Sequence, residues 1–487
     1  MTLIRYARWL AAGLLAGAAY LGLTAPAQAI PLFARQTGHN CAACHISYPE
    51  LTAYGREFKL NGYTFGEAQP IPLAFAMMGE YDTMPGVKSG AGASSAGLNH
   101  AQFVQYSVFF GGRITDNLGV FGQMSGSGAG MPGTNSFTPT VDNTEARYVH
   151  RFTNSGSLEP EAVLGVYVNN DYTMQDVWNT VPAWRFPWFP YSNYPSPLVG
   201  PGIPGTFLDN FSAPGATVGI GTYLWWHKTI YAEFALRRNA NGALSEFNWG
   251  NGANPGGLIN NAATTTATGT QGSGEAVDNY APYYRLAYSH DWGYNSFEAG
   301  LFGTDARTCN ITVDGNNNAV GSSTCSTGAT PTAFNYYRDI GVDSQYQYNK
   351  GEPWVYSASG SYIIEHSNQI ANGFGDSTLK EFNVRGTAYY NRQYGLTVGW
   401  TDFTGQSSGG AYTFNDATGA PVASSGNPAT TYWTLEANYL PMQDLRFSLM
   451  YQAFTKLDGY TSGIPGYAGN TNPSDFNRLT GAIWWVF

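Results

Sequence analysis

The chain has 487 residues, of which 11% are charged and 15% are aromatic, and its formal net charge is -10. This acidic balance argues against nucleic acid as a partner, because nucleic-acid binding depends on clustered Lys and Arg. The 60 glycines and 34 tyrosines, combined with so few charges, also argue against an ordinary soluble enzyme.

The first residues have the pattern of an export signal. Arg5 and Arg8 supply positive charge, an apolar run covers Trp9 to Leu23, and Ala27-Gln-Ala29 forms an A-x-A cleavage site. The run is shorter than the about 20 apolar residues that a membrane-spanning helix needs. We therefore predict a signal peptide over residues 1–29.

A haem-attachment motif follows this signal. Residues 41–45 read Cys-Ala-Ala-Cys-His, so that the thiols of Cys41 and Cys44 can add to the two vinyl groups of one haem while His45 binds its iron. A disulfide or half of a zinc site would use the same spacing, but a zinc site needs further Cys or His ligands nearby. His39 alone does not complete such a set, so the motif favours one covalently bound haem c.

The residues around the motif carry a resemblance to a known family. Residues 33–37 (Phe-Ala-Arg-Gln-Thr), 48–51 (Tyr-Pro-Glu-Leu) and 55–62 (Gly-Arg-Glu-Phe-Lys-Leu-Asn-Gly) resemble the cytochrome segment of the outer-membrane fused cytochrome–porins. That family includes the iron(II) oxidases of iron-oxidising bacteria. The resemblance covers this segment closely and the rest of the chain only in length and pattern. It implies a single haem c on the periplasmic side of a barrel, with electrons entering from outside the cell.

From Leu73 onward the chain alternates between apolar and polar residues, as strands with one apolar face do. In the first run, Phe75 and Met77 alternate with Ala76 and Met78. About 16 such runs can be counted, an even number as bacterial barrels require. They begin at Leu73 and continue at 100–115, 118–126, 144–152, 161–171, 216–226, 229–238, 282–290, 295–305, 334–348, 353–366, 380–392, 395–404, 431–440, 445–455 and 477–487.

Short and long connections alternate between these runs. The short ones include 115–118, 290–294, 349–351 and 441–443, and the long ones 173–214, 239–280, 306–333, 405–429 and 456–476. In outer-membrane barrels the short turns are periplasmic and the long loops extracellular. This pattern places the start of the first strand and the C-terminus in the periplasm.

These features predict an all-β fold, a transmembrane outer-membrane barrel of about 16 antiparallel strands over residues 73–487. Residues 30–72 form the haem c segment and its linker, which plugs or caps the periplasmic mouth. This segment is near the length, about 40 residues, below which a chain seldom folds without a staple such as haem. The linker over residues 67–72 is short and contains two prolines, so the haem unit stays under or inside the mouth.

Charged residues of the strands are expected to face the lumen, because Arg or Lys facing lipid near the midplane costs about 2–4 kcal/mol. Such residues either line a wet pore or hold a plug, and carboxylates among them would concentrate a cation. Alternation places them in three rows, which are Glu145 with Arg147 and Arg151, Glu233 with Arg237, and Glu381 with Asn383 and Arg385.

The motif leaves the sixth ligand of the haem iron open. Met78 is the best positional candidate, because it lies just past the linker on the polar face of the first strand. Met77 and Met84 are runners-up, and His39 is a competitor. Methionine would raise the haem potential, which suits an acceptor of electrons from Fe(II), whereas an open iron site would bind small molecules.

The other two cysteines, Cys309 and Cys325, flank a segment rich in Asn, Gly and Ser. In an oxidising compartment they are expected to form a loop disulfide. No nucleophile motif and no phosphate-binding loop is visible, so no catalytic residue is expected beyond the haem.

Two classes of function follow. The first is an enzyme of the iron(II):cytochrome c oxidoreductase type, embedded in the lipid bilayer of the outer membrane. One haem c would take electrons from extracellular Fe(II) and pass them to a periplasmic c-type cytochrome or blue copper protein. The second is a porin with a haem-containing gate, or a conduit for a different donor or acceptor. Fe(II) as donor is implied by the resemblance and agrees with the negative net charge.

Overall fold

The structure, a computed structural model, describes residues 32–70, 72–86, 100–126, 140–157, 159–180, 203–210, 217–239, 259–266, 269–313, 334–370, 373–408, 425–465 and 472–487. The predicted signal peptide over residues 1–29 lies outside them. The described helices are all short, namely α2 (Leu32–Thr37), α3 (Cys41–Cys44), α4 (Ala53–Leu60), α5 (Tyr172–Gln175), α6 (Phe207–Asn210) and the 3-10 helix η6 (Pro473–Phe476). No helix of this part of the chain is long and apolar enough to cross a membrane.

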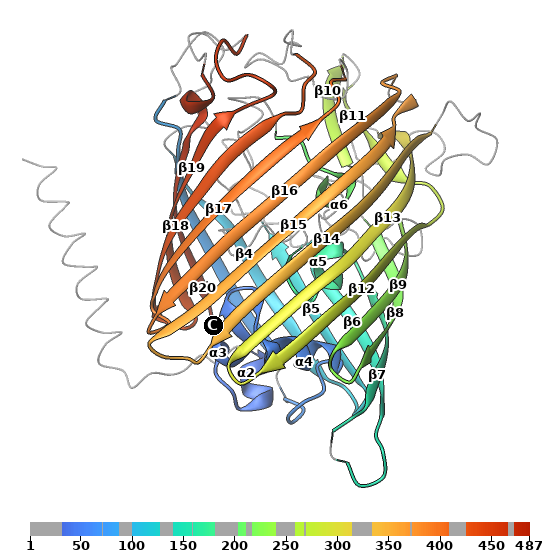
Figure 1. Cartoon of the computed structure of the whole chain (residues 1–487), viewed down its shortest axis with the longest axis vertical. Coiled ribbons are helices and arrows are strands. Elements are labelled where there is room, and N and C mark those ends of the chain that lie inside the picture. The colour runs from blue at the N-terminus through green and yellow to red at the C-terminus, as the bar shows by residue number, and fades with distance from the viewer. Residues whose placement is uncertain are drawn as a thin grey trace, which may run out of the picture.

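Within the same residues, sixteen strands form the wall of a closed antiparallel barrel (Figure 1). They are β3 (Leu73–Thr83), β4 (His100–Arg113), β5 (Leu118–Gly126), β6 (Thr140–Phe152), β7 (Ala162–Asn169), β8 (Thr217–Trp226), β9 (Ile230–Asn239), β12 (Ala281–Trp292), β13 (Asn295–Val313), β14 (Asn335–Asn349), β15 (Trp354–Asn368), β16 (Asp376–Tyr390), β17 (Tyr394–Gly405), β18 (Thr430–Met442), β19 (Leu445–Lys456) and β20 (Arg478–Val486). Each strand pairs with its neighbour along the wall, and β20 closes the barrel against β3. The predicted all-β barrel is therefore confirmed.

A hairpin extends the wall at the end of the barrel where the long connections lie. Its strands, β10 (Ile259–Thr266) and β11 (Gly269–Val277), interrupt the connection between β9 and β12, which themselves pair directly. Strand β11 pairs with the last residues of β13, from Thr308 to Val313. The long connection predicted over 239–280 is confirmed by the direct pairing of β9 with β12, but the hairpin within it was not predicted.

The two faces of the wall differ as the alternation predicts. In β3, Phe75 and Met77 are 43% and 44% exposed on the outside, whereas Ala76 and Met78 are buried. Large apolar side chains are likewise exposed on the outer face around the wall, for example Leu164, Leu286, Val342, Val398 and Leu449. An apolar outer band on a closed barrel is the pattern of a membrane-spanning β-barrel.

Aromatic side chains border this band near the short turns. Ring centroids lie 5.0 Å apart between Trp354 and Tyr390, 5.3 Å between Tyr394 and Tyr439, and 4.7 Å between Trp485 and Phe487. These residues belong to β15, β16, β17, β18 and β20 or directly follow the last of these strands. Such a girdle is typical of the level where a barrel meets the lipid headgroups.

Two parts of the described chain occupy the lumen. Residues 32–65 lie inside the barrel at the end with the short turns, next to the C-terminus (Figure 1). Deeper in the lumen lie α5 and α6, which belong to the long connection between β7 and β8. We call residues 170–180 and 203–210 the lumen loop. Residues 173–180 and 203–210 were predicted to lie in an extracellular loop, and residues 170–171 to end a strand; both predictions are wrong here, because these residues fold into the lumen.

Inward carboxylates of the wall hold the lumen loop in place. The backbone N–H of Leu208 donates to Asp339 Oδ2 at 2.8 Å, and that of Phe207 donates to Glu365 Oε2 at 2.6 Å. The guanidinium of Arg285 lies over the ring of Trp178, with its Cζ 4.9 Å from the ring centroid. Charged side chains that face inward provide hydrogen-bond partners for the backbone of a loop that folds into the lumen. No periodic pattern in the sequence predicts such a loop.

The assignment of the outer face predicts a depth-dependent cost for charge. Leu286→Arg, at a 56% exposed position in the middle of β12, should destabilise the barrel in lipid vesicles by about 2–4 kcal/mol. Tyr294→Arg, in the short turn that follows, is the matched control and should cost about 0–1 kcal/mol. Denaturant unfolding followed by tryptophan fluorescence measures both. Equal costs at the two positions would contradict the placement of the membrane.

Candidate functional site

The Cys-x-x-Cys-His motif is ordered by a single helical turn. The Asn40 side chain caps α3 by accepting from the N–H of Ala43 at 3.1 Å, and Cys41 and Cys44 occupy the two ends of the helix. Both cysteines are free and partly exposed, so neither thiol is consumed by a disulfide. The backbone becomes extended at His45, which starts the short strand β1 (His45–Ser47).

The imidazole of His45 is oriented by the turn that follows it. Its Nδ1 lies 3.2 Å from the carbonyl oxygen of Pro49, to which an Nδ1–H donates. Burial lowers the pKa of His45 to about 4, so the ring is neutral. A neutral ring with Nδ1–H bonded to a carbonyl keeps its Nε2 lone pair for a metal, as metal-binding histidines generally do.

Helix α4 packs directly against the motif, which explains the glycine at position 55. A Cβ on Gly55 would lie 2.3 Å from the carbonyl oxygen of Cys44. Thr52 joins the two elements, because its N–H donates to Cys44 O at 2.9 Å and its hydroxyl donates to Ala43 O at 2.5 Å. The same hydroxyl caps α4 by accepting from the N–H of Gly55. The haem motif and α4 are therefore one structural unit.

An aromatic cluster forms the small core of this unit. Phe33 of α2 stacks on Tyr63 at 5.4 Å and meets the edge of Phe58 at 4.9 Å. The Gln36 amide donates to the carbonyl oxygens of Tyr63 and Phe65 at 2.7 Å each, which ties α2 to the end of the segment. We call residues 32–65 the plug, because the contacts described next fasten this unit inside the barrel.

Arg56 fastens the plug to one side of the wall. Its guanidinium donates to Gln345 at 3.1 Å and Gln347 at 3.0 Å on β14, and also to Ser296 on β13. On the same side, Glu50 accepts from Gln347 at 3.0 Å. All of these side chains are buried.

The opposite side of the plug meets the row of Glu145, Arg147 and Arg151 on β6. Tyr63 donates to Glu145 at 2.8 Å, and Glu145 accepts two hydrogen bonds of 2.9 Å from Arg147. Arg151 donates to the Asn61 side chain at 2.8 Å. These inward charges therefore hold a plug, which decides between the two roles that the sequence left open.

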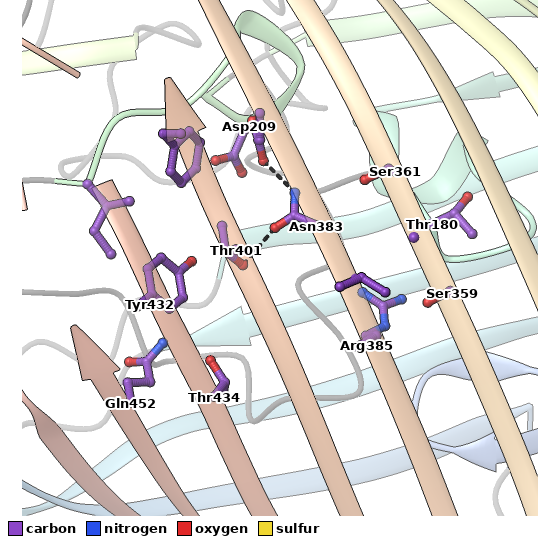
Figure 2. Close-up of a pocket in the computed structure, with 15 residues that line it drawn as sticks. Thr180, Asp209, Ser359, Ser361, Asn383, Arg385, Thr401, Tyr432, Thr434 and Gln452 are labelled. Carbon is purple, nitrogen blue, oxygen red and sulfur yellow. Dashed lines mark hydrogen bonds between the residues drawn. The ribbon is translucent and has the colours of Figure 1, made fainter. Parts of the chain in front are cut away.

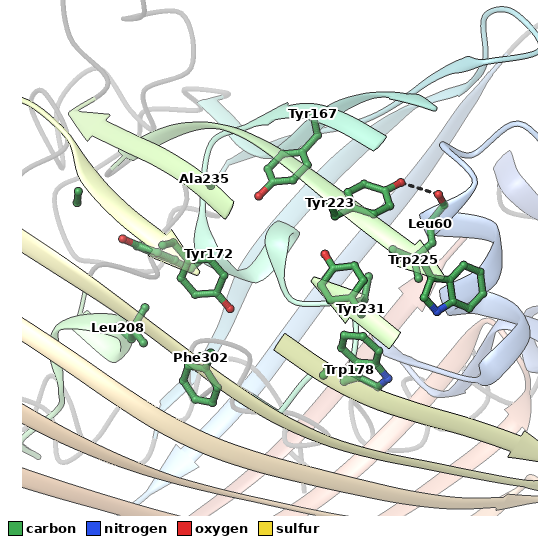
Figure 3. Close-up of a cluster of buried hydrophobic side chains, with 14 of the residues drawn as sticks. Leu60, Tyr167, Tyr172, Trp178, Leu208, Tyr223, Trp225, Tyr231, Ala235 and Phe302 are labelled. Atoms are coloured by element: carbon green, nitrogen blue, oxygen red, sulfur yellow. Dashed lines mark hydrogen bonds between the residues drawn. The ribbon is translucent and has the colours of Figure 1, made fainter. Parts of the chain in front are cut away.

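Further strands complete the ring of contacts. Tyr223 of β8 donates to the carbonyl oxygen of Leu60 at 2.5 Å, beside the buried cluster of the lumen (Figure 3). Arg446 of β19 donates to the carbonyl oxygen of Tyr48 at 3.1 Å. The plug thus contacts strands spread around the whole circumference, from β6 and β8 through β13 and β14 to β19.

The other two predicted rows of inward residues hold the lumen loop. Glu381 accepts from the Thr206 hydroxyl at 3.0 Å, and Arg237 donates to Gln175 at 2.8 Å. Glu233 accepts from Tyr167 at 2.5 Å within the wall. Their inward orientation is confirmed, and so is that of Asn383 and Arg385, which line the cavity described below.

The candidate sixth ligands lie in different places. Met78 is buried in a cluster with Trp484, against which Tyr48 packs, and the Tyr48 ring lies 5.1 Å from the His45 ring. Met77 points out of the barrel, and Met84 follows β3 at its far end. His39 is exposed and its ring lies 5.0 Å from Tyr54. Met78 is the methionine of these three whose side chain faces the plug.

Cys309 is disulfide-bonded, as expected, while its predicted partner Cys325 lies outside the described residues. Among the residues that the structure describes, no group of three or more His, Cys, Asp or Glu is arranged to hold a metal ion.

A cavity separates the lumen loop from the inner wall of β15 to β19 (Figure 2). Its volume is about 60 Å³. Its lining is mostly polar and includes Thr180 and Asp209 of the lumen loop and Ser361, Glu381 and Arg385 of the wall. The strand alternation identified three of the wall residues that line it, Glu381, Asn383 and Arg385, but not the cavity, which exists only once the lumen loop folds inward.

Comparisons with known proteins describe the fold alone. No protein-family model and no curated protein matches the chain. Similar solved structures include OmpF of Salmonella typhi in complex with daunomycin, with 11% identity over 85% of this chain and 97% of that chain and a TM-score of 0.43. The loop L8 deletion mutant of OmpT from Vibrio cholerae and an anion-selective porin from Comamonas acidovorans each show 10% identity over 85% of this chain and 98% of theirs, with TM-scores of 0.40. At these values the likeness carries no information about function.

The Arg56 contacts predict how the plug can be loosened. Arg56→Ala leaves buried acceptors on β13 and β14 unpaired, which costs about 1–3 kcal/mol. Trypsin should then cleave the folded protein at the buried Lys59 faster than it cleaves the wild type. Arg338→Ala is the matched control, because this arginine is exposed on the outside of β14. Unchanged cleavage at Lys59 in the Arg56 variant would contradict the anchoring role.

Proposed function

We propose that the protein is an outer-membrane electron-transfer protein of the iron(II):cytochrome c oxidoreductase type. It takes electrons from extracellular Fe(II) onto one haem c in the plug and passes them to a periplasmic c-type cytochrome or blue copper protein. The observation that supports this proposal is that a unit built around Cys41, Cys44 and His45 fills one end of a membrane barrel.

The outer membrane is the proposed location because closed barrels of this kind occur there. The apolar outer band and the aromatic girdle support insertion in a bilayer. In bacterial barrels the short turns face the periplasm, and the plug lies at the end with the short turns, which supports a periplasmic position for it. A carrier in the periplasm would then approach the plug through the mouth beside α2 and α3.

The residues of the plug fit a covalently bound haem. Cys41 and Cys44 have free thiols one helical turn apart, and His45 presents a neutral ring with a lone pair at Nε2. We propose Cys41 and Cys44 as the attachment sites, His45 as the axial ligand and Met78 as the sixth ligand. A haem held in this way supplies a site that gains and loses one electron at a time.

The rest of the chain insulates and orients this unit. Contacts around the circumference fix the plug, so the electron-accepting site stays at one depth in the barrel. The lumen loop closes much of the remaining space, which keeps Fe(III), the poorly soluble product, on the outside. Each Fe(II) that is oxidised loses one electron, and no proton or group needs to cross the wall.

A porin with a haem-containing gate is the second candidate. It would need the plug or the lumen loop to leave the lumen. Buried hydrogen bonds at Arg56, Glu145, Arg446 and Glu381 argue against easy release, because breaking them exposes unpaired charges inside the wall.

Covalent attachment is tested by intact mass. The mature chain should start at Ile30 and carry the mass of one haem, and the double variant Cys41→Ser, Cys44→Ser should lose that mass because thioether bonds need both thiols. The double variant Cys309→Ser, Cys325→Ser is the matched control and should keep it. A full haem complement in the first variant would refute attachment at the motif.

Electron transfer is tested with protein in sealed vesicles whose long connections face outward. External Fe(II) should reduce the haem, seen by its absorbance, while an iron-sensitive dye inside stays dark, since the lumen is plugged. The Cys41→Ser, Cys44→Ser variant in the same vesicles should show no haem signal. A rapid dye response would favour the porin, and a haem that stays oxidised would exclude Fe(II) as the donor.

A further inference from the structure

The cavity beside the lumen loop has the features of a ligand site that the plug does not use. It lies between the lumen loop, which contributes Thr180 and Asp209, and the inner face of β15 to β19 (Figure 2). Two carboxylates, Glu381 and Asp209, line it together with one positive charge, Arg385. Hydroxyl and amide groups provide most of the remaining polar lining.

Two buried polar atoms in this cavity lack a partner within the described part of the chain. The hydroxyl of Ser361, a residue that is 3% exposed, has no hydrogen-bond partner there, and neither does the Oε1 atom of Gln452, which is 6% exposed. Both residues line the cavity. Buried polar groups are rarely left unsatisfied, so these atoms indicate that the cavity takes a polar or hydrated ligand.

A cation with its own water shell suits this set of groups. Hard divalent cations prefer oxygen ligands, and the lining offers carboxylate, hydroxyl and amide oxygens. Glu381 already accepts from Thr206 and from Asn383 at 2.9 Å, so it is available as a charge more than as an inner ligand. The carboxylates outnumber Arg385, and the site lacks the ligands for tight chelation, which favours weak, reversible binding of the hydrated ion.

The cavity is linked to the haem motif through Asn179, which precedes the lining residue Thr180 in the chain. The side-chain oxygen of Asn179 accepts from the N–H of Leu51 at 3.0 Å, and its carbonyl oxygen accepts from Arg385. Leu51 is the cross-strand partner of His45 in the two-stranded sheet of β1 and β2 (Glu50–Leu51). Two hydrogen bonds thus lead from Arg385, which lines the cavity, to Leu51, the strand partner of the proposed axial ligand.

We propose that this cavity binds a hydrated divalent cation and is where extracellular Fe(II) delivers its electron. The inference rests on the proposed function, which it makes specific. In the step, hydrated Fe(II) loses one electron and becomes Fe(III). The haem that Cys41, Cys44 and His45 would hold is the oxidant and would accept this electron. The ion keeps its bound waters throughout. Fe(III) leaves by the route through which Fe(II) entered.

The test uses Mn(II), a divalent ion with the same preference for oxygen ligands, and haem-loaded full-length protein. Electron paramagnetic resonance of free Mn(II) gives the dissociation constant. Glu381→Gln and Asp209→Asn keep the side-chain size but remove a charge. Each should raise the dissociation constant of Mn(II) for the cavity at least fivefold. Each should also raise the Fe(II) concentration for half-maximal haem reduction at least fivefold. Asp305→Asn removes the same charge from the outside of β13 and should change neither value.

The outcomes separate this inference from the function on which it rests. Wild-type Mn(II) binding and wild-type reduction by Fe(II) in both cavity variants would overturn the cavity site and leave the proposed function intact. Mn(II) binding that depends on Glu381, in a protein that Fe(II) does not reduce, would support the cation site and overturn the proposed function. Heat-modifiable migration on gels verifies that each variant forms the barrel.

Discussion

Lipid offers no partner to a charge, and this constraint shapes the whole molecule. The wall strands expose large apolar side chains on the outer face, and buried ionised residues such as Glu145, Arg237 and Arg285 lie in the lumen. A lumen lined in this way needs partners of its own, because a buried unpaired charge is costly. The plug and the lumen loop are those partners. Arg56 and Tyr63 of the plug, and backbone N–H groups of the lumen loop, bind side chains that could not point anywhere else.

The same constraint gives a physical meaning to the residues around the haem motif. Gly55 allows α4 to lie on the carbonyl oxygen of Cys44, and Arg56 one position later reaches β13 and β14. Phe58 packs in the aromatic cluster, and Asn61 accepts from Arg151 on β6. These residues serve docking as well as local folding. A haem held by this unit would be oriented by the barrel, because the wall fixes the residues that surround the motif.

A plugged barrel with one haem motif limits how electrons could cross the membrane. The apolar band of such barrels is about 25 Å tall, more than one haem can bridge. The plug raises the motif into the lumen from one end, and the cation site proposed beside the lumen loop would bring a small ion inward from the other. Asn179 lies where the two meet, in contact with both Leu51 and Arg385. In the proposed function, the distance that the electron must cross between Fe(II) and the haem is therefore shortened from both ends of the barrel.

The sequence by itself determined the wall and the chemistry-bearing motif. Strand alternation depends on a period of two residues and on the contrast between lipid and lumen, both of which are local, so sixteen strands and their inward residues Glu145, Arg147, Glu233 and Glu381 could be predicted. The Cys-x-x-Cys-His spacing is equally local. Only the tertiary structure decided that the lumen loop turns inward, that Met78 faces the plug while Met77 faces outward, and that Thr180, Ser361 and Glu381 share a cavity. Those facts depend on contacts between residues far apart in the chain, where neither a period nor a spacing carries information.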